Sequence, residues 1–312
     1  MKDKLIKNVS ASVLERLLKH SKKENISYQQ VLQSYLMERF LYRMSQSKYQ
    51  EKFILKGALL LRSWQGEIGR ATKDIDLLAR VENSLDNLTV IIKECLLQEI
   101  KDGVNFECDS VKATEIVKDA KYQGVRINVL ASIGSARLSL QIDCGFGDIV
   151  VPKAKWIDYP ELLNYGQPRL LGYSLESVIA EKFHAIVDLD LANSRMKDFY
   201  DIWLLRENNK FDGKQLAKAI EATFENRQTL LPKETPLGLT ESFWKNDNKI
   251  KQWKAFLQRT KLKVRELTFE ETIIKVKDFL LPLIKIQSKG EQIELYWEPS
   301  IGWVDIKREK KD

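Results

Sequence analysis

Apolar residues at helical spacing mark two segments near the start of the chain. In residues 10–21 the apolar positions form one stripe with charged positions between them, and Ser10 can cap the segment. A second stripe of this kind follows Ser27. The two stripes consist of Val13, Leu14, Leu17 and Leu18, and of Val31, Leu32, Tyr35, Leu36 and Phe40. We therefore expect two helices that brace the segments after them.

Strand-like patterns follow in the middle of the chain. The apolar segment 53–61 is interrupted at Lys56 and Gly57. Later segments are rich in apolar and β-branched residues and show the alternation that is typical of strands. These segments are residues 74–79, 124–131 and 137–144. We expect them to form a small mixed sheet with an intervening helix.

Beyond Pro160 the pattern becomes helical. Helices are expected over residues 174–189, 195–206, 214–227 and 241–260, with turn residues between Pro232 and Gly238. Residues 291–305 can form a short hairpin around Pro299 and Gly302. The expected fold is therefore α/β (α+β), with N-terminal helices and a mixed sheet in residues 1–155 and a mainly helical domain in residues 156–312.

Composition adds limits on class and location. Of 312 residues, 44% are hydrophobic and 30% charged, which favours an ordered, helix-rich protein over a disordered one. The net charge of +7 suits polyanionic partners. Three cysteines without a close pair argue against a disulfide framework. We expect a cytoplasmic protein without a membrane segment, because no signal peptide and no long apolar run are present.

Asp74 and Asp76 lie two residues apart in the expected strand 74–79. Side chains at this spacing project to one face of a strand, so the two carboxylates would stand side by side, with Ile75 and Leu77 buried behind them. Adjacent carboxylates repel each other unless protons or cations bridge them. The pair is thus suited to hold one or two Mg²⁺ ions. The alternative is an exposed strand end with two solvated acids.

Two further candidates lie near this pair in the expected sheet. Gly57 lets the backbone approach a ligand closely, and a loop or helix start there would offer amide groups to phosphate oxygens. Asp143 has apolar neighbours in a strand-like run and could add a third carboxylate. Alternatively, it caps or turns the chain into residues 145–148. The residues alone leave both interpretations of Asp143 open.

Lys182 falls on the apolar stripe of the helix expected over residues 174–189. An inward lysine needs an anionic partner, which a triphosphate or a carboxylate cluster would supply. The alternative is a stem that follows the core edge to water. If Lys182 serves phosphate, Lys182→Met should weaken triphosphate binding without lowering thermal stability. Asp198 and Asp201 share a face of the next helix, where solvated acids in a first turn are also common.

Together these segments resemble the abortive-infection nucleotidyltransferase toxins, the AbiEii/AbiGii group of the polymerase-β-like nucleotidyltransferase superfamily. The resemblance extends over nearly the whole chain. Its motifs are K-G-A-L-L-L (residues 56–61), R-A-T-K-D-I-D-L (70–77), I-D-C-G-F-G-D (142–148), the helix with Glu181 and Lys182, and R-M-K-D-F-Y-D (195–201).

The resemblance implies a role for each matching residue. The catalytic residues would be Asp74, Asp76, Lys182 and Asp198, the Mg²⁺ ligands Asp74, Asp76 and Asp143, and the nucleotide-binding residues Lys56, Gly57, Ala58, Arg70, Thr72, Lys182 and Lys197. The superfamily usually has Gly-Gly or Gly-Ser at the phosphate loop, whereas Ala58 follows Gly57 here. Phosphate contact would therefore rest on backbone amides.

The activity that the resemblance implies is Mg²⁺-dependent transfer of a nucleoside monophosphate from a nucleoside triphosphate to an acceptor hydroxyl. The acceptor would be the 3′ end of tRNA, and the enzyme the toxin of a toxin–antitoxin or phage-defence system with a cognate antitoxin. Two alternatives stay open. One is a non-catalytic RNA- or protein-binding module on a decayed nucleotidyltransferase fold, and the other is a nucleotidyltransferase that acts on protein.

A basic segment after Trp244 favours RNA among these acceptors. Its cations are Lys245, Lys249, Lys251, Lys254, Arg259, Lys261, Lys263 and Arg265. Trp253, Phe256 and Leu257 can anchor the segment and leave a basic face outward, which would hold a sugar–phosphate backbone. The alternative is a solvated amphipathic helix.

Overall fold

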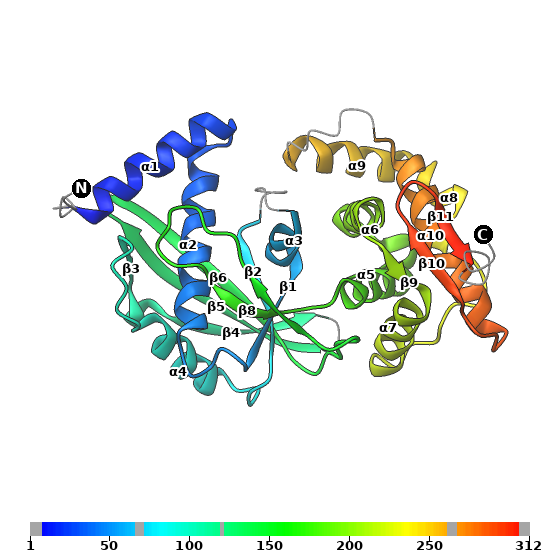
Figure 1. Cartoon of the computed structure of the whole chain (residues 1–312), viewed down its shortest axis with the longest axis horizontal. Coiled ribbons are helices and arrows are strands. Elements are labelled where there is room, and N and C mark those ends of the chain that lie inside the picture. Colours follow the sequence, from blue (N-terminus) through cyan, green and yellow to red (C-terminus); the bar gives the residue numbers. More distant parts are fainter. Residues whose placement is uncertain (1–7, 66–71, 119–121, 261–266, 306–312) are drawn as a thin grey trace. The chain divides into compact units, whose positions relative to one another are not determined.

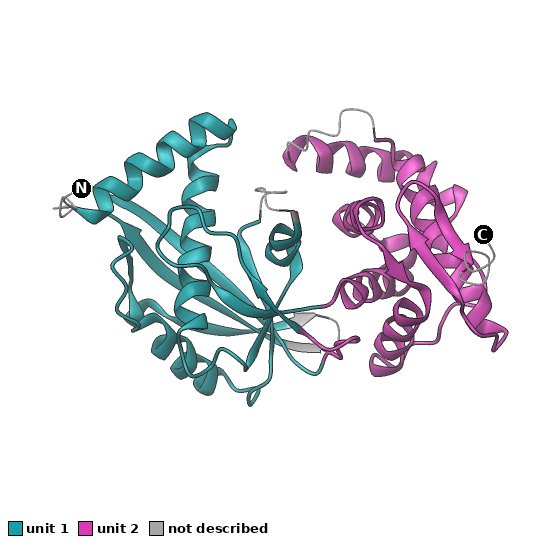
Figure 2. Cartoon of the chain, in the orientation of Figure 1, with its two compact units in different colours: residues 1–147, 155–173 teal, residues 148–154, 174–312 magenta. Residues whose placement is uncertain are grey.

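The computed structural model describes residues 8–65, 72–118, 122–260 and 267–305. The chain forms two compact units, shown in Figure 2. Unit 1 consists of residues 1–147 and 155–173, and unit 2 of residues 148–154 and 174–312. The expected α/β class is confirmed, because unit 1 carries a mixed sheet with helices and unit 2 is mainly helical.

The division between the units differs from the boundary expected after residue 155. Residues 155–173 contain β7 (Lys155–Asp158) and β8 (Arg169–Gly172), and β8 pairs in parallel with β1 (Phe53–Lys56). These backbone hydrogen bonds tie the segment into the sheet of unit 1. Between residues 147 and 174, only residues 148–154 belong to the helical unit.

Unit 1 is built on a mixed sheet in which strands distant in sequence lie side by side (Figure 1). The strand order is β3-β5-β6-β2-β1-β8-β7, and β4 pairs with β5. Two pairs, β2–β6 and β1–β8, are parallel. The remaining elements of unit 1 are α1 (Val9–Glu24), α2 (Tyr28–Ser45), α3 (Gly57–Gln65), β2 (Asp74–Ala79), α4 (Leu85–Leu96), β3 (Val104–Phe106), β4 (Lys112–Lys118), β5 (Tyr122–Ile133) and β6 (Ala136–Gly145).

The two faces of this sheet differ in polarity. In β5 and β6 one face carries buried apolar residues such as Ile127, Leu140 and Ile142, and helix α2 crosses the strands in Figure 1. Residues that alternate with these, among them Asp143, project to the opposite face. In β5 and β6 the apolar face therefore belongs to the core, and the other face carries mainly polar side chains.

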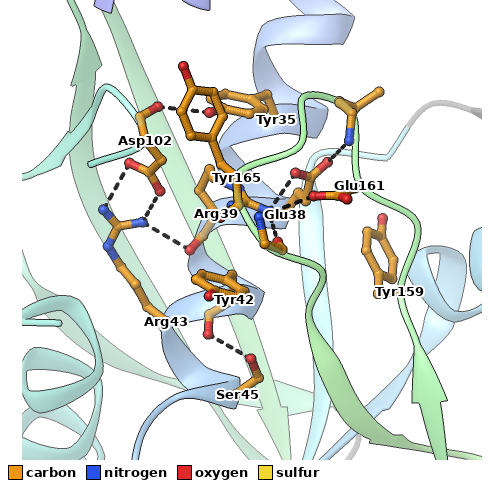
Figure 3. Close-up of polar contacts among 12 residues, drawn as sticks. Tyr35, Glu38, Arg39, Tyr42, Arg43, Ser45, Asp102, Tyr159, Glu161 and Tyr165 are labelled. Atoms are coloured by element: carbon orange, nitrogen blue, oxygen red, sulfur yellow. Dashed lines mark hydrogen bonds and ion pairs between the residues drawn. The ribbon is translucent and has the colours of Figure 1, made fainter. Parts of the chain in front are cut away.

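Ion pairs inside unit 1 hold α2 in place (Figure 3). The Arg43 guanidinium donates to both carboxylate oxygens of Asp102 at 2.6 and 3.1 Å. Arg39, fully buried, donates to Glu38 and to the backbone carbonyl of Gly166, each at 2.7 Å. Burial of a charge is costly unless it is paired and hydrogen-bonded. The Arg43–Asp102 ion pair and the Arg39 hydrogen bond to Gly166 thus fix α2 to the segments at residues 102 and 166.

Unit 2 contains the helices expected after residue 160, with two differences. Its elements are α5 (Leu175–Leu189), α6 (Met196–Asn208), β9 (Phe211–Asp212), α7 (Gly213–Asn226), α8 (Glu241–Trp244), α9 (Asp247–Thr260), α10 (Phe269–Ser288), β10 (Leu295–Glu298) and β11 (Gly302–Asp305). The hairpin expected over residues 291–305 is confirmed as β10 and β11.

The first difference is that the helix expected over residues 241–260 is two helices. The Asn246 side chain accepts hydrogen bonds from the backbone amides of Asn248 and Lys249, and this cap starts α9. The second is α10, which pattern analysis overlooked. Its capping box, formed by Thr268 and Glu271, was visible in the sequence as a start signal.

None of the helices in the described ranges is both long and apolar enough to cross a membrane. The cytoplasmic location expected from the sequence stays a prediction.

Candidate active site

Strand register brings three carboxylates together on the polar face of unit 1. Asp76 in β2 lies opposite Asp143 in β6, and Asp74 lies two residues away on the same face of β2. One carboxylate oxygen from each of the three residues lies within 4.8 Å of the others. The structure therefore places the Asp143 carboxylate beside the pair, and its role as a metal ligand stays a prediction.

Neighbouring side chains hold these carboxylates in position. The Thr72 hydroxyl donates to Asp74 at 2.6 Å. The Arg126 guanidinium donates to both oxygens of Asp143 at 2.9 and 2.8 Å, from the position opposite Asp143 on β5. These hydrogen bonds, with the negative charges of all three carboxylates, raise the pKa of Arg126. Sequence analysis missed Arg126, because only the β5–β6 register pairs it with an acid.

The carboxylate cluster has the chemistry of a divalent-cation site. Carboxylate oxygens are the hard donors that Mg²⁺ takes, commonly from one or two carboxylates with water and phosphate completing the shell. A carboxylate has about four lone-pair directions, so the Arg126 fork leaves Asp143 with capacity for a further partner. Asp74 and Asp76 are half-buried, which leaves them accessible to a bound nucleotide.

Gly57 lies where β1 turns into α3, directly against the carboxylate pair. Lys56, the last residue of β1, lies opposite Asp76, and Gly57 has a φ of +69°. A β-carbon at Gly57 would overlap the Asp76 carboxylate. Glycine is therefore needed here for its backbone conformation and for the space that Asp76 occupies, besides the phosphate contact expected from the sequence.

We expect Gly57→Ala to lower transfer activity strongly, because the added methyl would displace Asp76 and strain the backbone. The direct strain at a positive φ is about 1–2 kcal/mol. Activity should fall by about tenfold or more, while Gly290→Ala, at the same φ of +69° but with open space around the added methyl, should leave it within a few-fold. Steady-state kinetics and thermal melts of both variants check this. Equal effects of the two substitutions would contradict the role of Gly57 as clearance for Asp76.

Lys182 and Asp198 form a second cluster, which belongs to unit 2. The Lys182 ammonium on α5 donates to Asp198 at 2.8 Å and to Asp201 at 2.7 Å, both on α6. The Arg195 guanidinium donates to the other oxygen of Asp198 at 2.6 Å. Asp198 is fully buried and Asp201 nearly so. The sequence left either a triphosphate or a carboxylate cluster as the partner of Lys182. Within unit 2 its partners are the carboxylates of Asp198 and Asp201.

The charge state of Asp198 follows from these contacts. Burial would raise its pKa, but Lys182 and Arg195 outweigh burial and lower the pKa of Asp198 to about 2. A carboxylate with so low a pKa is a weak proton acceptor at neutral pH. We therefore favour orientation of Lys182 over general-base catalysis as the role of Asp198.

Three other residues named from the sequence have different outcomes. Thr72 contacts Asp74, so it supports a carboxylate directly. Lys197 lies exposed in the first turn of α6. Arg70 lies outside the described residues.

Asp148, which had no assigned role, accepts a hydrogen bond at 3.1 Å from Arg227. The same guanidinium lies 3.3 Å from Nδ1 of His184, whose Nε2 is 2.9 Å from the Thr229 hydroxyl. Burial, together with Arg227, lowers the pKa of His184 to about 4, so the ring is neutral near pH 7. These contacts explain His184 as part of a structural cluster in unit 2.

The mixed sheet of unit 1 thus presents clustered carboxylates beside a glycine that begins a helix. The model of the family described as "Nucleotidyl transferase AbiEii toxin, Type IV TA system" matches residues 39–275. The chain belongs to this family and is a nucleotidyltransferase.

A solved structure supports the fold. A candidate nucleotidyltransferase from Helicobacter pylori shares 15% identity with a TM-score of 0.50, and the match covers 86% of this chain and 100% of that one. JHP933 from Helicobacter pylori shares 15% identity over 85% of this chain and 95% of its own, with a TM-score of 0.48. No curated protein matches the chain.

Proposed function

We propose that this protein transfers a nucleoside monophosphate from a nucleoside triphosphate to the 3′-terminal hydroxyl of RNA, with tRNA as the preferred acceptor. In this proposal Mg²⁺ is the cofactor and the protein is the toxin of a toxin–antitoxin pair with a cognate antitoxin. The observation that carries the proposal is the convergence of Asp74, Asp76 and Asp143 on one face of the sheet. Membership in a toxin family supports the biological role.

In the proposed mechanism, Asp74 and Asp76 hold Mg²⁺ with Asp143 beside them. The ion would neutralise triphosphate charge and favour ionisation of the attacking hydroxyl. Thr72 and Arg126 orient the carboxylates, as their hydrogen bonds require.

Positive charge around the triphosphate would come from several residues of the chain. In unit 1 we assign phosphate contacts to the backbone at residues 57–58 and to Lys56. The phosphate contacts expected from the sequence for Arg70, Lys182 and Lys197 stay predictions. Lys182 already forms ion pairs with Asp198 and Asp201. In this proposal the two carboxylates would hold the ammonium group in position.

The direct test incubates the full chain with each of the four labelled nucleoside triphosphates, Mg²⁺, total tRNA and total cellular protein. We expect label on RNA, at the 3′ end, and loss of labelling when the terminal hydroxyls are removed by periodate oxidation. Label on protein alone would support the alternative of a protein acceptor. RNA binding without any transfer would support a non-catalytic binding module and overturn the proposal.

Part of the basic segment remains available for RNA, and part does not. Helix α9 leaves Lys251, Lys254 and Arg259 exposed, while Trp253 and Phe256 are buried as expected. Lys249, which we expected on the outward basic face, is half-buried instead.

The Lys249 ammonium donates to the backbone carbonyl of Asn193 at 2.7 Å and lies 5.0 Å from the centre of the Phe243 ring. Desolvation lowers its pKa. Its charge therefore serves contacts within unit 2. Lys261, Lys263 and Arg265 lie outside the described residues.

For the exposed cations of α9 we expect charge reversal to weaken RNA binding selectively. Lys251→Glu combined with Lys254→Glu should lower tRNA affinity and reduce the slope of log K against log salt by about 1 to 2. Triphosphate affinity should stay unchanged. Filter binding at several salt concentrations measures both. Lys214→Glu with Lys218→Glu on α7 of the same unit makes the same charge change, and equal losses in both doubles would contradict a docking role for α9.

A further inference from the structure

The polar face of the sheet continues well beyond the three carboxylates. Residues paired directly across neighbouring strands project to the same face, so the register sorts the face into rows. The first row runs from Asp76 through Asp143 and Arg126 to Thr114. The second runs from Asp74 through Gln141 and Asn128 to Lys112, the third joins Ser139 to Leu130, and the fourth joins Arg137, Ser132 and Asn105.

We call the part outside the carboxylates the row surface. It consists of Lys112, Thr114, Arg126, Asn128, Leu130, Ser132, Arg137, Ser139, Gln141 and Asn105. Along β6, Arg137 lies six residue steps from Asp143, or about 20 Å at about 3.3 Å per residue.

The row surface is accessible. Lys112, Asn128, Arg137 and Ser139 are exposed, and Leu130 keeps 50% of its surface. The residues that alternate with them on β5 and β6, such as Val129 and Leu138, are buried on the helical side. β5 and β6 are therefore exposed on the face that continues from the three carboxylates.

The charge of the row surface is positive. Its ionisable residues are Lys112, Arg126 and Arg137, and none of its ten positions carries a carboxylate. Arg126 is neutralised by Asp143, whereas no ion pair joins Lys112 or Arg137 to any other residue of the described ranges. Amide and hydroxyl side chains occupy most of the positions between them. Such a surface matches a ligand with phosphate charges and many hydrogen-bonding groups.

We propose that the row surface binds the single-stranded 3′ segment of the acceptor RNA and leads its terminal hydroxyl to Asp74 and Asp76. The inference rests on the proposed transfer to RNA and deepens it by naming where the acceptor strand lies. Lys112 and Arg137 contact phosphates. Asn128, Gln141 and Ser139 bond to ribose hydroxyls and base edges, and Leu130 supports a base face.

Physical arguments favour a single strand over other occupants. A flat sheet face with amides and cations contacts splayed nucleotides, whose bases and 2′-hydroxyls are available for hydrogen bonds. A triphosphate is too short to reach from the carboxylates to Arg137 along about 20 Å of strand. An acidic protein would also be attracted to the cations, so the experiment below separates it from RNA.

The experiment uses the full chain with Lys112→Glu and Arg137→Glu combined. Each substituted side chain is exposed, so the fold should persist, and a thermal melt checks it. We expect the Kd for total tRNA to rise about tenfold and the log K against log salt slope to fall by about 1.4, for two single-strand phosphate contacts. KM for tRNA should rise, and KM for the triphosphate should stay within about twofold.

A matched control is Lys52→Glu with Lys93→Glu. These two lysines make the same charge change in unit 1, and they lie before β1 and on α4, outside the row surface. The neutral pair Lys112→Gln with Arg137→Gln should give an intermediate loss. If the row-surface variant and the control bind and modify tRNA equally well, the row surface is not the acceptor site.

The outcomes separate this inference from the proposed function. If the unaltered protein labels RNA and the row-surface variant does so with unchanged KM, the inference fails and the function stands. If the unaltered protein labels only protein, the proposed function fails, and the inference fails with it. Removal of the unpaired 3′ nucleotides of tRNA should weaken binding to the unaltered protein but not further weaken binding to the variant. An equal further loss in the variant would overturn the inference.

Discussion

Asp74→Asn and Asp76→Asn are each expected to reduce nucleotidyl transfer by about 1,000-fold or more. Asparagine keeps the size of the side chain but removes the charge that would hold a divalent cation. If the cation contributes about 4 kcal/mol to transition-state stabilisation, its loss corresponds to a factor of about 1,000. The measurement is incorporation of labelled nucleotide at saturating Mg²⁺.

The control for this prediction is Asp158→Asn at the exposed end of β7, in the same unit. Its activity should match that of the unaltered protein. Removal of one carboxylate from the cluster should not unfold unit 1, because repulsion among three acids is relieved. Near-normal transfer by either cluster variant would show that these carboxylates are not the metal ligands. Loss of cooperative unfolding would assign them a structural role.

Lys182→Met is expected to lower the free energy of unfolding by about 3–5 kcal/mol, the usual cost of breaking a buried ion pair by removal of one partner. The lysine bridges Asp198 and Asp201, and both carboxylates are buried. This corrects the expectation from the sequence that its loss would be neutral for stability. That expectation assumed a lysine whose partner was bound phosphate. Urea denaturation of the nucleotide-free protein measures the change.

A double-mutant cycle makes the test of Lys182 specific. In an Asp198→Asn background, Lys182→Met should cost less, because one carboxylate no longer needs the ammonium. Lys218→Met is the matched control, since this exposed lysine lies on α7 of the same unit and has no assigned role. Unchanged stability of Lys182→Met together with weakened triphosphate binding would contradict the ion-pair assignment and restore the original one.

Local pattern was sufficient to predict much of the site. The two-residue spacing of Asp74 and Asp76 predicted their shared face, because strand geometry depends only on neighbours in the chain. The inward position of Lys182 followed from helical periodicity in the same way. Arg126 could not be found by such arguments, since its pairing with Asp143 depends on the register of two strands.

In the fold, too, local patterns predicted some elements and missed those that depend on partners distant in sequence. Helices α5, α6 and α7 were predicted to within two residues at each end, because caps and apolar stripes are local signals. The short strands β7 and β8 were not, since four residues of strand carry little pattern and are stabilised by partners distant in sequence. Lys249 illustrates the limit at a single residue. Its charge predicted exposure, but its contacts with Asn193 and Phe243 come from tertiary packing.

The alternation of the chain between the two units has a consequence for dissecting this protein. The chain passes from unit 1 to unit 2 after residue 147, returns after 154 and leaves again after 173. A single proteolytic cut therefore cannot release both units whole. A fragment that ends at residue 155 would lack the β8 strand that pairs with Ile54 and Leu55. Such a fragment would expose the edge of β1, next to Gly57, and would be prone to edge-to-edge aggregation.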